Sequence, residues 1–261
     1  LKDHAERPHA NAVLGQLRSQ LGAVPDLNVF LRIPPLISIG QSGRSAYLNP
    51  REAYPMASTY KVPIAVRLLQ RVDAGEIALT DMVDVKPHNL SPGSGTISQL
   101  FNDPGLSISV LNLLELMLLI SDNSATDMCL ELAGGGEAVT NAMKDLGIDD
   151  VRVDRSTLLL IADYIGIENV PPDAERTPES FQTLSQKLTD EQRRVAGKAF
   201  AEDPRDCASP EGMARLLQLV WTNEVLSNES NELLRDIMSR CETGQARILG
   251  RLPEGTPVAH K

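Results

Sequence analysis

The segment Ser58-Thr59-Tyr60-Lys61 places a hydroxyl and an amine three residues apart. In a helix, this spacing puts both side chains on one face. A serine hydroxyl becomes a nucleophile when a base takes its proton, and a lysine kept neutral by burial and nearby cations can be that base. Free backbone N–H groups at a helix start can also stabilise an oxyanion. Taken alone, the motif is more typical of an N-cap serine followed by a surface lysine, because this four-residue pattern is common by chance.

A second candidate motif, Ser121-Asp122-Asn123, directly follows the apolar segment Val110 to Ile120. That segment is too short to span a bilayer and indicates a buried helix. The hydroxyl of Ser121 can pass on a proton, and the carboxamide of Asn123 can bind a substrate amide. An ordinary helix N-cap is the alternative interpretation of this motif when it is taken alone.

Together, in this order, the two motifs resemble those of the penicillin-recognising serine enzymes, and of class A β-lactamases in particular. The resemblance covers most of the chain, from about residue 10 onward. It extends to further stretches that match the family pattern: Tyr54 to Ala57, Asp122 to Thr126, Val153 to Arg155, Asp203 to Asp206, and Arg247 to Lys261.

The resemblance implies a role for each matching residue. Ser58 would be the acylated nucleophile and Lys61 its proton acceptor. Ser121 would relay a proton to the leaving nitrogen, and Asn123 would bind the side-chain amide of the substrate. Lys261 would face the substrate carboxylate. The chain stops at Lys261, where the third family motif begins, so we expect either a truncated chain or an incomplete protein.

The family pair that closes the omega loop is matched by Arg155 and Asp206. The resemblance therefore implies an enlarged omega-type loop over residues 155–206. In class A enzymes, a glutamate two residues after the loop arginine activates the deacylating water. Thr157 stands at that position here and has no carboxylate. We therefore expect deacylation to be impaired or rerouted.

Three glutamates inside this segment could replace the missing carboxylate: Glu168, Glu175 and Glu179. Glu168, which is followed by Asn169, is the first choice. For each of them, a solvated surface carboxylate without a catalytic role is the alternative. Lys61 with Ser121 could also serve in both acylation and deacylation.

The elements that must position these residues follow from hydrophobic periodicity and from turn residues. Residues 10–22 and 58–74 predict helices, with Pro63 in the first turns of the second and Gly75 as its cap. Residues 27–39 predict an edge strand broken by two prolines, and residues 45–48 a second strand. Further helices are expected over 109–120, 124–132, 137–146, 191–202, 209–221 and 229–240.

Composition limits the possible function. The chain has 261 residues and a net charge of −10, which argues against nucleic acid or an anionic membrane as the main partner. The three cysteines, Cys129, Cys207 and Cys241, show no metal-binding spacing. One disulfide is possible in an oxidising compartment, and three buried thiols are the simpler alternative. No metal or organic cofactor is implied.

The resemblance implies an α+β fold of the β-lactamase/transpeptidase type, a helical subdomain plus an antiparallel sheet flanked by helices. The helical subdomain would span about 62–210, and the α/β subdomain about 1–61 and 211–261. The expected function is a serine acyl-transfer hydrolase acting on β-lactams. Alternatives are an esterase, a D-Ala-D-Ala-type peptidase acting on peptidoglycan-like substrates, or a sensor that stays acylated. We expect a monomer, and a periplasmic or secreted location by resemblance. The sequence begins at Leu1 with neither an initiator Met nor a signal segment, so we expect that a targeting segment was removed or that the chain was trimmed.

Overall fold

The computed structural model describes residues 37–39, 44–46, 50–101, 105–244 and 257–261. The helix predicted over 10–22 lies outside these residues. So does most of the broken strand predicted over 27–39, and so does most of the segment from 247 to 261.

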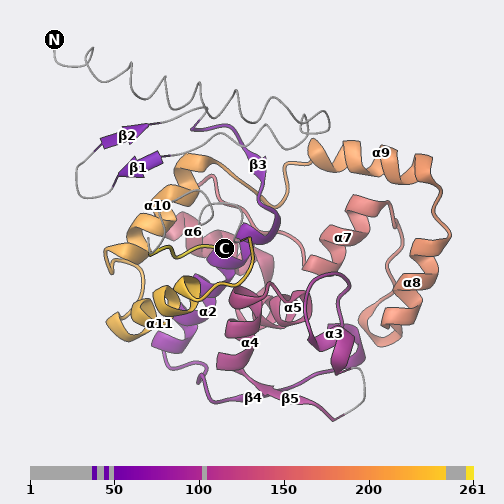
Figure 1. The fold of residues 1–261 in the computed structure, drawn as a ribbon, viewed down its shortest axis with the longest axis horizontal. Helices are drawn as coiled ribbons and strands as arrows, with labels where there is room; N and C mark the ends of the chain where they lie inside the picture. Colours follow the sequence, from indigo (N-terminus) through magenta and orange to yellow (C-terminus); the bar gives the residue numbers. More distant parts are fainter. Residues whose placement is uncertain (1–36, 40–43, 47–49, 102–104, 245–256) are drawn as a thin grey trace.

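Buried helices form the centre of the described molecule (Figure 1). Helices α2 (Lys61–Asp73), α4 (Val110–Leu119) and α5 (Asn123–Leu132) pack against one another, and α6 (Gly135–Asp145) packs on α2 and α5. The apolar run that predicts α4 is buried in this core, where each enclosed leucine or isoleucine contributes about 1.5–3 kcal/mol. This core holds the beginnings of α2 and α5 in fixed positions.

The helix predicted from Ser58 to Ala74 is correct in extent but not uniform in type. Its first turn is a 3-10 helix, η2 (Ala57–Tyr60), and α2 begins at Lys61. Pro63 lies in the first turn of α2, where its missing N–H costs least. Gly75 follows the end of α2 with φ +71°, the left-handed conformation that ends many helices.

Helices α10 (Pro210–Trp221) and α11 (Asn228–Ser239) confirm two further predictions. Each begins after a serine, Ser209 or Ser227, whose side chain accepts a hydrogen bond from the helix backbone. Helix α11 packs on α2 and α4, so this part of the chain covers the core from another side. The turn-rich stretch before residue 105 contains η3 (Pro87–Asn89) and the short α3 (Ile97–Leu100).

The described strands are short and pair in antiparallel couples. The pairing of β3 with β6 is the one that concerns the candidate site, because it aligns Tyr54 with Ala208 and so brings residue 206 beside the segment that leads to Ser58. The couples are β1 (Ile37–Ile39) with β2 (Arg44–Ala46), β3 (Tyr54–Pro55) with β6 (Cys207–Ala208), and β4 (Met82–Asp84) with β5 (Ser107–Ser109).

Residues 155–206 are more ordered than a loop. They form α7 (Thr157–Ile165), η4 (Asp173–Glu175), α8 (Pro178–Gln186) and α9 (Asp190–Ala201). This corrects the expectation of one enlarged loop with a single solvated helix. Helices α7 and α8 enclose a small apolar core of their own: Leu158, Ala162, Ile167 and Phe181. Helix α9 buries no residue, as expected for a solvated helix.

The three cysteines are unpaired and buried. In the part of the chain that the structure describes, no helix is long and apolar enough to cross a membrane. The same residues hold no group of three or more His, Cys, Asp or Glu side chains arranged to bind a metal ion. The division into two subdomains stays a prediction.

Candidate active site

Ser58 lies in η2, between the strand β3 and the long helix α2. The residue before it, Ala57, has φ +47°, and Ser121 has φ +63°. Residues other than glycine rarely adopt this left-handed conformation, which costs about 1–3 kcal/mol and is often found at functional sites. The fold thus maintains strained backbone at both predicted serines.

Lys61, the first residue of α2, has a fully buried side chain. Its Nζ donates hydrogen bonds to the Ser121 carbonyl oxygen at 2.8 Å, to the Ser121 hydroxyl at 3.0 Å and to Asn123 Oδ1 at 3.0 Å. None of these three partners is a carboxylate. The direct partners of the buried amine are therefore all neutral, and burial without a carboxylate partner disfavours its charged form.

The two serine hydroxyls lie close together, with 3.1 Å between Ser58 Oγ and Ser121 Oγ. Ser121 Oγ therefore contacts both Ser58 and Lys61. Among the hydrogen bonds of the described residues, Lys61 is connected to Ser58 through Ser121 and not directly. The sequence predicts Lys61 as the immediate proton acceptor, whereas this geometry places Ser121 between the two groups.

Burial and the nearby cation Lys261 lower the pKa of Lys61 from 10.5 to about 7. Asp127, Asp122 and Cys129 oppose this shift, but their combined effect is smaller. Near neutral pH, a large fraction of Lys61 is therefore uncharged and can accept a proton.

Asp122 and Asn123 fasten the loop that precedes α3. Asp122 Oδ2 accepts backbone N–H groups from Thr96 at 2.6 Å and Ile97 at 2.9 Å, and Oδ1 accepts the N–H of Ala125 at 2.9 Å. Asn123 Nδ2 donates to the Pro92 carbonyl at 2.7 Å. Asn123 thus binds Lys61 through its oxygen and this loop through its nitrogen. One N–H of the amide is left for a further partner.

Lys261 approaches the same region from the far end of the chain. Its Nζ donates to the Leu118 carbonyl at 2.9 Å, near the end of α4. Burial lowers the pKa of Lys261 to about 8. Because Lys261 also lowers the pKa of Lys61, the structure brings these two predicted site residues into electrostatic contact.

Arg155 and Asp206 form the predicted ion pair. Arg155 Nε donates to Asp206 Oδ2 at 2.6 Å, and both side chains are buried. The Arg155 guanidinium also binds Asp163 of α7 at 2.6 Å and Asp203 at 3.0 Å, and it lies over the ring of Phe200 in α9. Arg155 thereby joins both ends of the helical segment 155–206.

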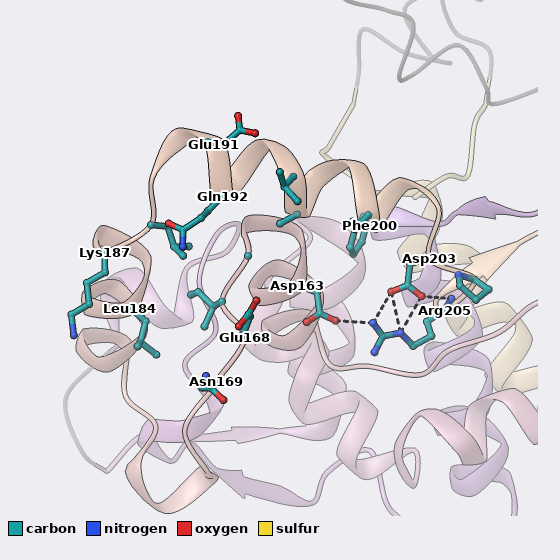
Figure 2. Close-up of a pocket in the computed structure, with 17 residues that line it drawn as sticks. Asp163, Glu168, Asn169, Leu184, Lys187, Glu191, Gln192, Phe200, Asp203 and Arg205 are labelled. Atoms are coloured by element: carbon teal, nitrogen blue, oxygen red, sulfur yellow. Dashed lines mark hydrogen bonds and ion pairs between the residues drawn. The ribbon is translucent and has the colours of Figure 1, made fainter.

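The structure does not bring the three glutamates of this segment to the Ser58 cluster. Glu168, Glu175 and Glu179 are all exposed, and no hydrogen bond or ion pair of the described residues joins them to Ser58, Lys61 or Ser121. Glu168 lines a groove of about 860 Å³ between α7, α8 and α9. Figure 2 shows Glu168 in this groove, with Asp163 and Arg205 toward one end and Lys187 at the other.

Two sets of contacts next to the cluster were not predicted from the sequence. Thr157, noted only for lacking a carboxylate, contacts the phenol of Tyr60. Asp127 accepts hydrogen bonds from Ser91 and from the backbone of Thr157 and Leu158. Asp127 lies one helical turn after Asn123, and this spacing is the signal that could have indicated it.

Comparison with known proteins identifies the family. The model of the beta-lactamase enzyme family matches residues 36–261. The chain belongs to this family. Extended-spectrum beta-lactamase PER-1 from Pseudomonas aeruginosa is 28% identical over 82% of this chain and 58% of its own length. The chain spans 58% to 60% of the length of the curated relatives that it matches first.

Solved structures support the same fold. A beta-lactamase from Chitinophaga pinensis superposes with a TM-score of 0.70 at 23% identity, over 97% of this chain and 77% of that one. A mutant of PBP-A, in an acyl-enzyme complex with penicillin G, gives a TM-score of 0.68 at 21% identity, over 96% of this chain and 76% of that one. The α+β fold expected from the sequence is therefore confirmed.

Proposed function

We propose that this member of the beta-lactamase family is a serine acyl-transfer hydrolase that opens β-lactams through an acyl-enzyme on Ser58. The observation that carries the proposal is the continuous contact from Ser58 Oγ to Ser121 Oγ at 3.1 Å and on to Lys61 Nζ at 3.0 Å. A nucleophile, a relay and a buried amine thus lie in sequence.

The three contacts of Lys61 fit a neutral amine. The Ser121 carbonyl and Asn123 Oδ1 can only accept, so they use two N–H groups. The lone pair of a neutral Lys61 is then available to the Ser121 hydroxyl proton, and Ser121 Oγ can accept the proton of Ser58. All three hydrogen bonds of Lys61 can therefore form when its amine is neutral, which is the form that can act as a base.

In the proposed acylation, Ser58 Oγ forms a bond to the β-lactam carbonyl carbon as its proton passes through Ser121 to Lys61. The tetrahedral intermediate then collapses, and the bond from the carbonyl carbon to the lactam nitrogen breaks. The proton returns through Ser121 to that nitrogen. Asn123 has an N–H available for the side-chain amide of the substrate, and Lys261 supplies a cation for its carboxylate.

Deacylation requires a water molecule to attack the ester, with the water proton taken up and Ser58 reprotonated as it leaves. No carboxylate among the described residues forms a hydrogen bond or ion pair with the side chains of Ser58, Ser121 or Lys61. We propose that Lys61 and Ser121 serve in this step as well, and that hydrolysis of the acyl-enzyme is slow because no better placed base assists it.

Mass spectrometry of the intact protein after mixing with penicillin G tests the proposal. We expect one adduct per chain with the full mass of penicillin, because ring opening releases no leaving group, and we expect it on the peptide that contains Ser58. Ser58→Ala should show no adduct. Labelling of Ser58→Ala, or no labelling of the wild-type chain at any time, would refute the proposal.

A penicillin-binding protein that stays acylated is the second candidate, and the exposed positions of Glu168, Glu175 and Glu179 favour it. The two candidates differ in turnover after the first equivalent of β-lactam. An ester or D-Ala-D-Ala-type peptide would be opened by the same chemistry. The proposal includes a location in the periplasm or outside the cell, because β-lactams and peptidoglycan are met there. It also includes a monomeric protein.

A further inference from the structure

Thr157 is tied to the helix that carries Lys61. Its side chain is buried, and its hydroxyl forms a hydrogen bond with the phenol of Tyr60, the residue immediately before Lys61. The Tyr60 side chain is also almost completely buried. This contact joins the first residue of α7 to the beginning of α2 across 97 residues of sequence.

Asp127 ties the same end of α7 to α5. Its carboxylate accepts the N–H of Thr157 at 2.5 Å, the N–H of Leu158 at 3.1 Å and the hydroxyl of Ser91 at 2.6 Å. The first N–H groups of a helix lack intrahelical partners and favour negative charge. Asp127 therefore caps α7 from a neighbouring helix, and it lies one turn after Asn123, which binds Lys61.

The start of α7 is thus fastened to α2, which begins with Lys61, and to α5, which begins with its partner Asn123. We propose that Thr157 and Asp127 are positioning residues, which dock α7 against Tyr60 and keep water away from Lys61. The inference deepens the proposed function, because it assigns to the position that lacks a carboxylate the task of keeping the lysine dry.

The charged and titratable groups around Lys61 show how the docking of α7 would affect the pKa of this lysine. Lys261 comes from the far end of the chain, Asp122 and Asp127 from α5 and its N-cap, and Cys129 from α5. Burial is the largest cause of the lowered pKa of Lys61. If α7 moved away and water entered, the pKa of Lys61 would rise. A rise by one would reduce the neutral fraction at pH 7 from about one half to about one tenth.

Thr157→Val removes the hydroxyl and keeps the shape of the side chain, whereas Thr157→Ser keeps the hydroxyl. Thr140→Val is the matched control. The Thr140 hydroxyl donates a hydrogen bond to the Val153 carbonyl at 2.7 Å and accepts one from the Val153 N–H at 2.9 Å. These bonds join α6 to the segment before Arg155. Thr140 contacts neither Tyr60 nor Asp127 through any hydrogen bond of the described residues.

The test is an NMR titration of the full chain labelled with carbon-13 at the lysine side chains, with the Lys61 signal assigned from its loss in Lys61→Arg. We expect the Lys61 midpoint to move upward in Thr157→Val and to stay near the wild-type midpoint in Thr157→Ser. Thr140→Val is expected to lower the melting temperature without moving this midpoint. Tyr60→Phe removes the same hydrogen bond from the Tyr60 side and should raise the Lys61 midpoint as Thr157→Val does. It therefore provides the test if Thr157→Val folds poorly.

An unchanged Lys61 midpoint in both Thr157→Val and Tyr60→Phe would overturn the inference. An equal shift in Thr140→Val would do the same, because it would show a general loss of packing. The titration does not require acylation, so failure of the wild-type chain to react with penicillin G would refute the proposed function and leave the positioning role to be decided by the midpoints.

Discussion

At the residue scale, the decisive feature is a lysine that is buried without a carboxylate partner. Lys61 donates only to neutral oxygen atoms, and a second cation, Lys261, lies near enough to lower its pKa further. A charged group that is buried without an oppositely charged partner usually shifts its pKa and becomes neutral. In the proposed acylation, the neutral form of Lys61 is the one that can take up the proton of Ser58 through Ser121.

Acylation should therefore depend on the titration of Lys61. The rate constant for acylation by penicillin G should rise with pH about a midpoint near 7, because only the neutral amine is a base and the pKa of Lys61 is about 7. Lys61→Arg keeps the charge but not the base, and should reduce the rate constant at least about 10²-fold. Rapid-quench measurements from pH 5 to pH 9 check this, and a nearly normal rate for Lys61→Arg would contradict it.

For Glu168, in contrast to Lys61, we expect substitution to have almost no effect on the reaction. It is exposed in the groove between α7, α8 and α9, and it contacts none of Ser58, Ser121 and Lys61 in the described residues. We expect Glu168→Gln to leave the rate of acyl-enzyme hydrolysis within about twofold of wild type, since a general base is worth about 10²–10⁴-fold. A larger loss, measured as the decay of the isolated acyl-enzyme, would show that Glu168 reaches the site.

At the element scale, Arg155 joins the two ends of the helical segment 155–206. It binds Asp163 in α7, Asp203 after α9 and Asp206 before β6, and its own side chain is only 6% exposed. Removing one partner from a buried ion pair leaves an uncompensated charge, which is more costly than the pair itself is stabilising.

Arg155→Ala should consequently lower the free energy of unfolding by about 3–5 kcal/mol. Arg194→Ala is the control, because its pair with Glu191 lies on the exposed face of α9 and such pairs contribute little. Urea unfolding at neutral pH measures both changes. Similar losses for the two variants would show that Arg155 does not hold the segment in place.

The elements themselves differ in how far the sequence predicts them. Helices α4, α10 and α11 follow from apolar periodicity and serine caps, signals that lie within each segment. Helix α8 was missed inside a polar stretch, although Thr177 and Pro178 are typical of a helix start. The pairing of β3 with β6 joins residues far apart in the chain, and no local pattern specifies it.

The site shows the same division. The types and order of Ser58, Lys61 and Ser121 predict the chemistry, but only the folded chain shows that Ser121 lies between the other two. The contact of Thr157 with Tyr60 could not be predicted, because it depends on where α7 docks. The cap that Asp127 gives to α7 depends on packing between helices in the same way.

At the scale of the whole molecule, the candidate site collects residues from distant parts of the chain. Ser58 and Lys61 come from the η2–α2 junction and Lys261 from the last described segment. Ser121 comes from the turn between α4 and α5, and Asn123 is the first residue of α5. The fold suits the proposed acylation, since the proposed nucleophile Ser58, relay Ser121 and base Lys61 already lie within hydrogen-bond distance in that order. Among the described residues, no carboxylate forms a hydrogen bond or ion pair with the side chains of Ser58, Ser121 or Lys61, and the proposed slow second step rests on this.

This imbalance leads to the central claim, that Ser58 is acylated faster than it is released. A rapid-quench time course with penicillin G, read as the mass of the Ser58 peptide, measures both steps at once. We predict that the adduct approaches one per chain and then decays slowly, while product release after the first equivalent falls to the rate of that decay. Rapid linear product release with no adduct on Ser58 at any time would contradict the account.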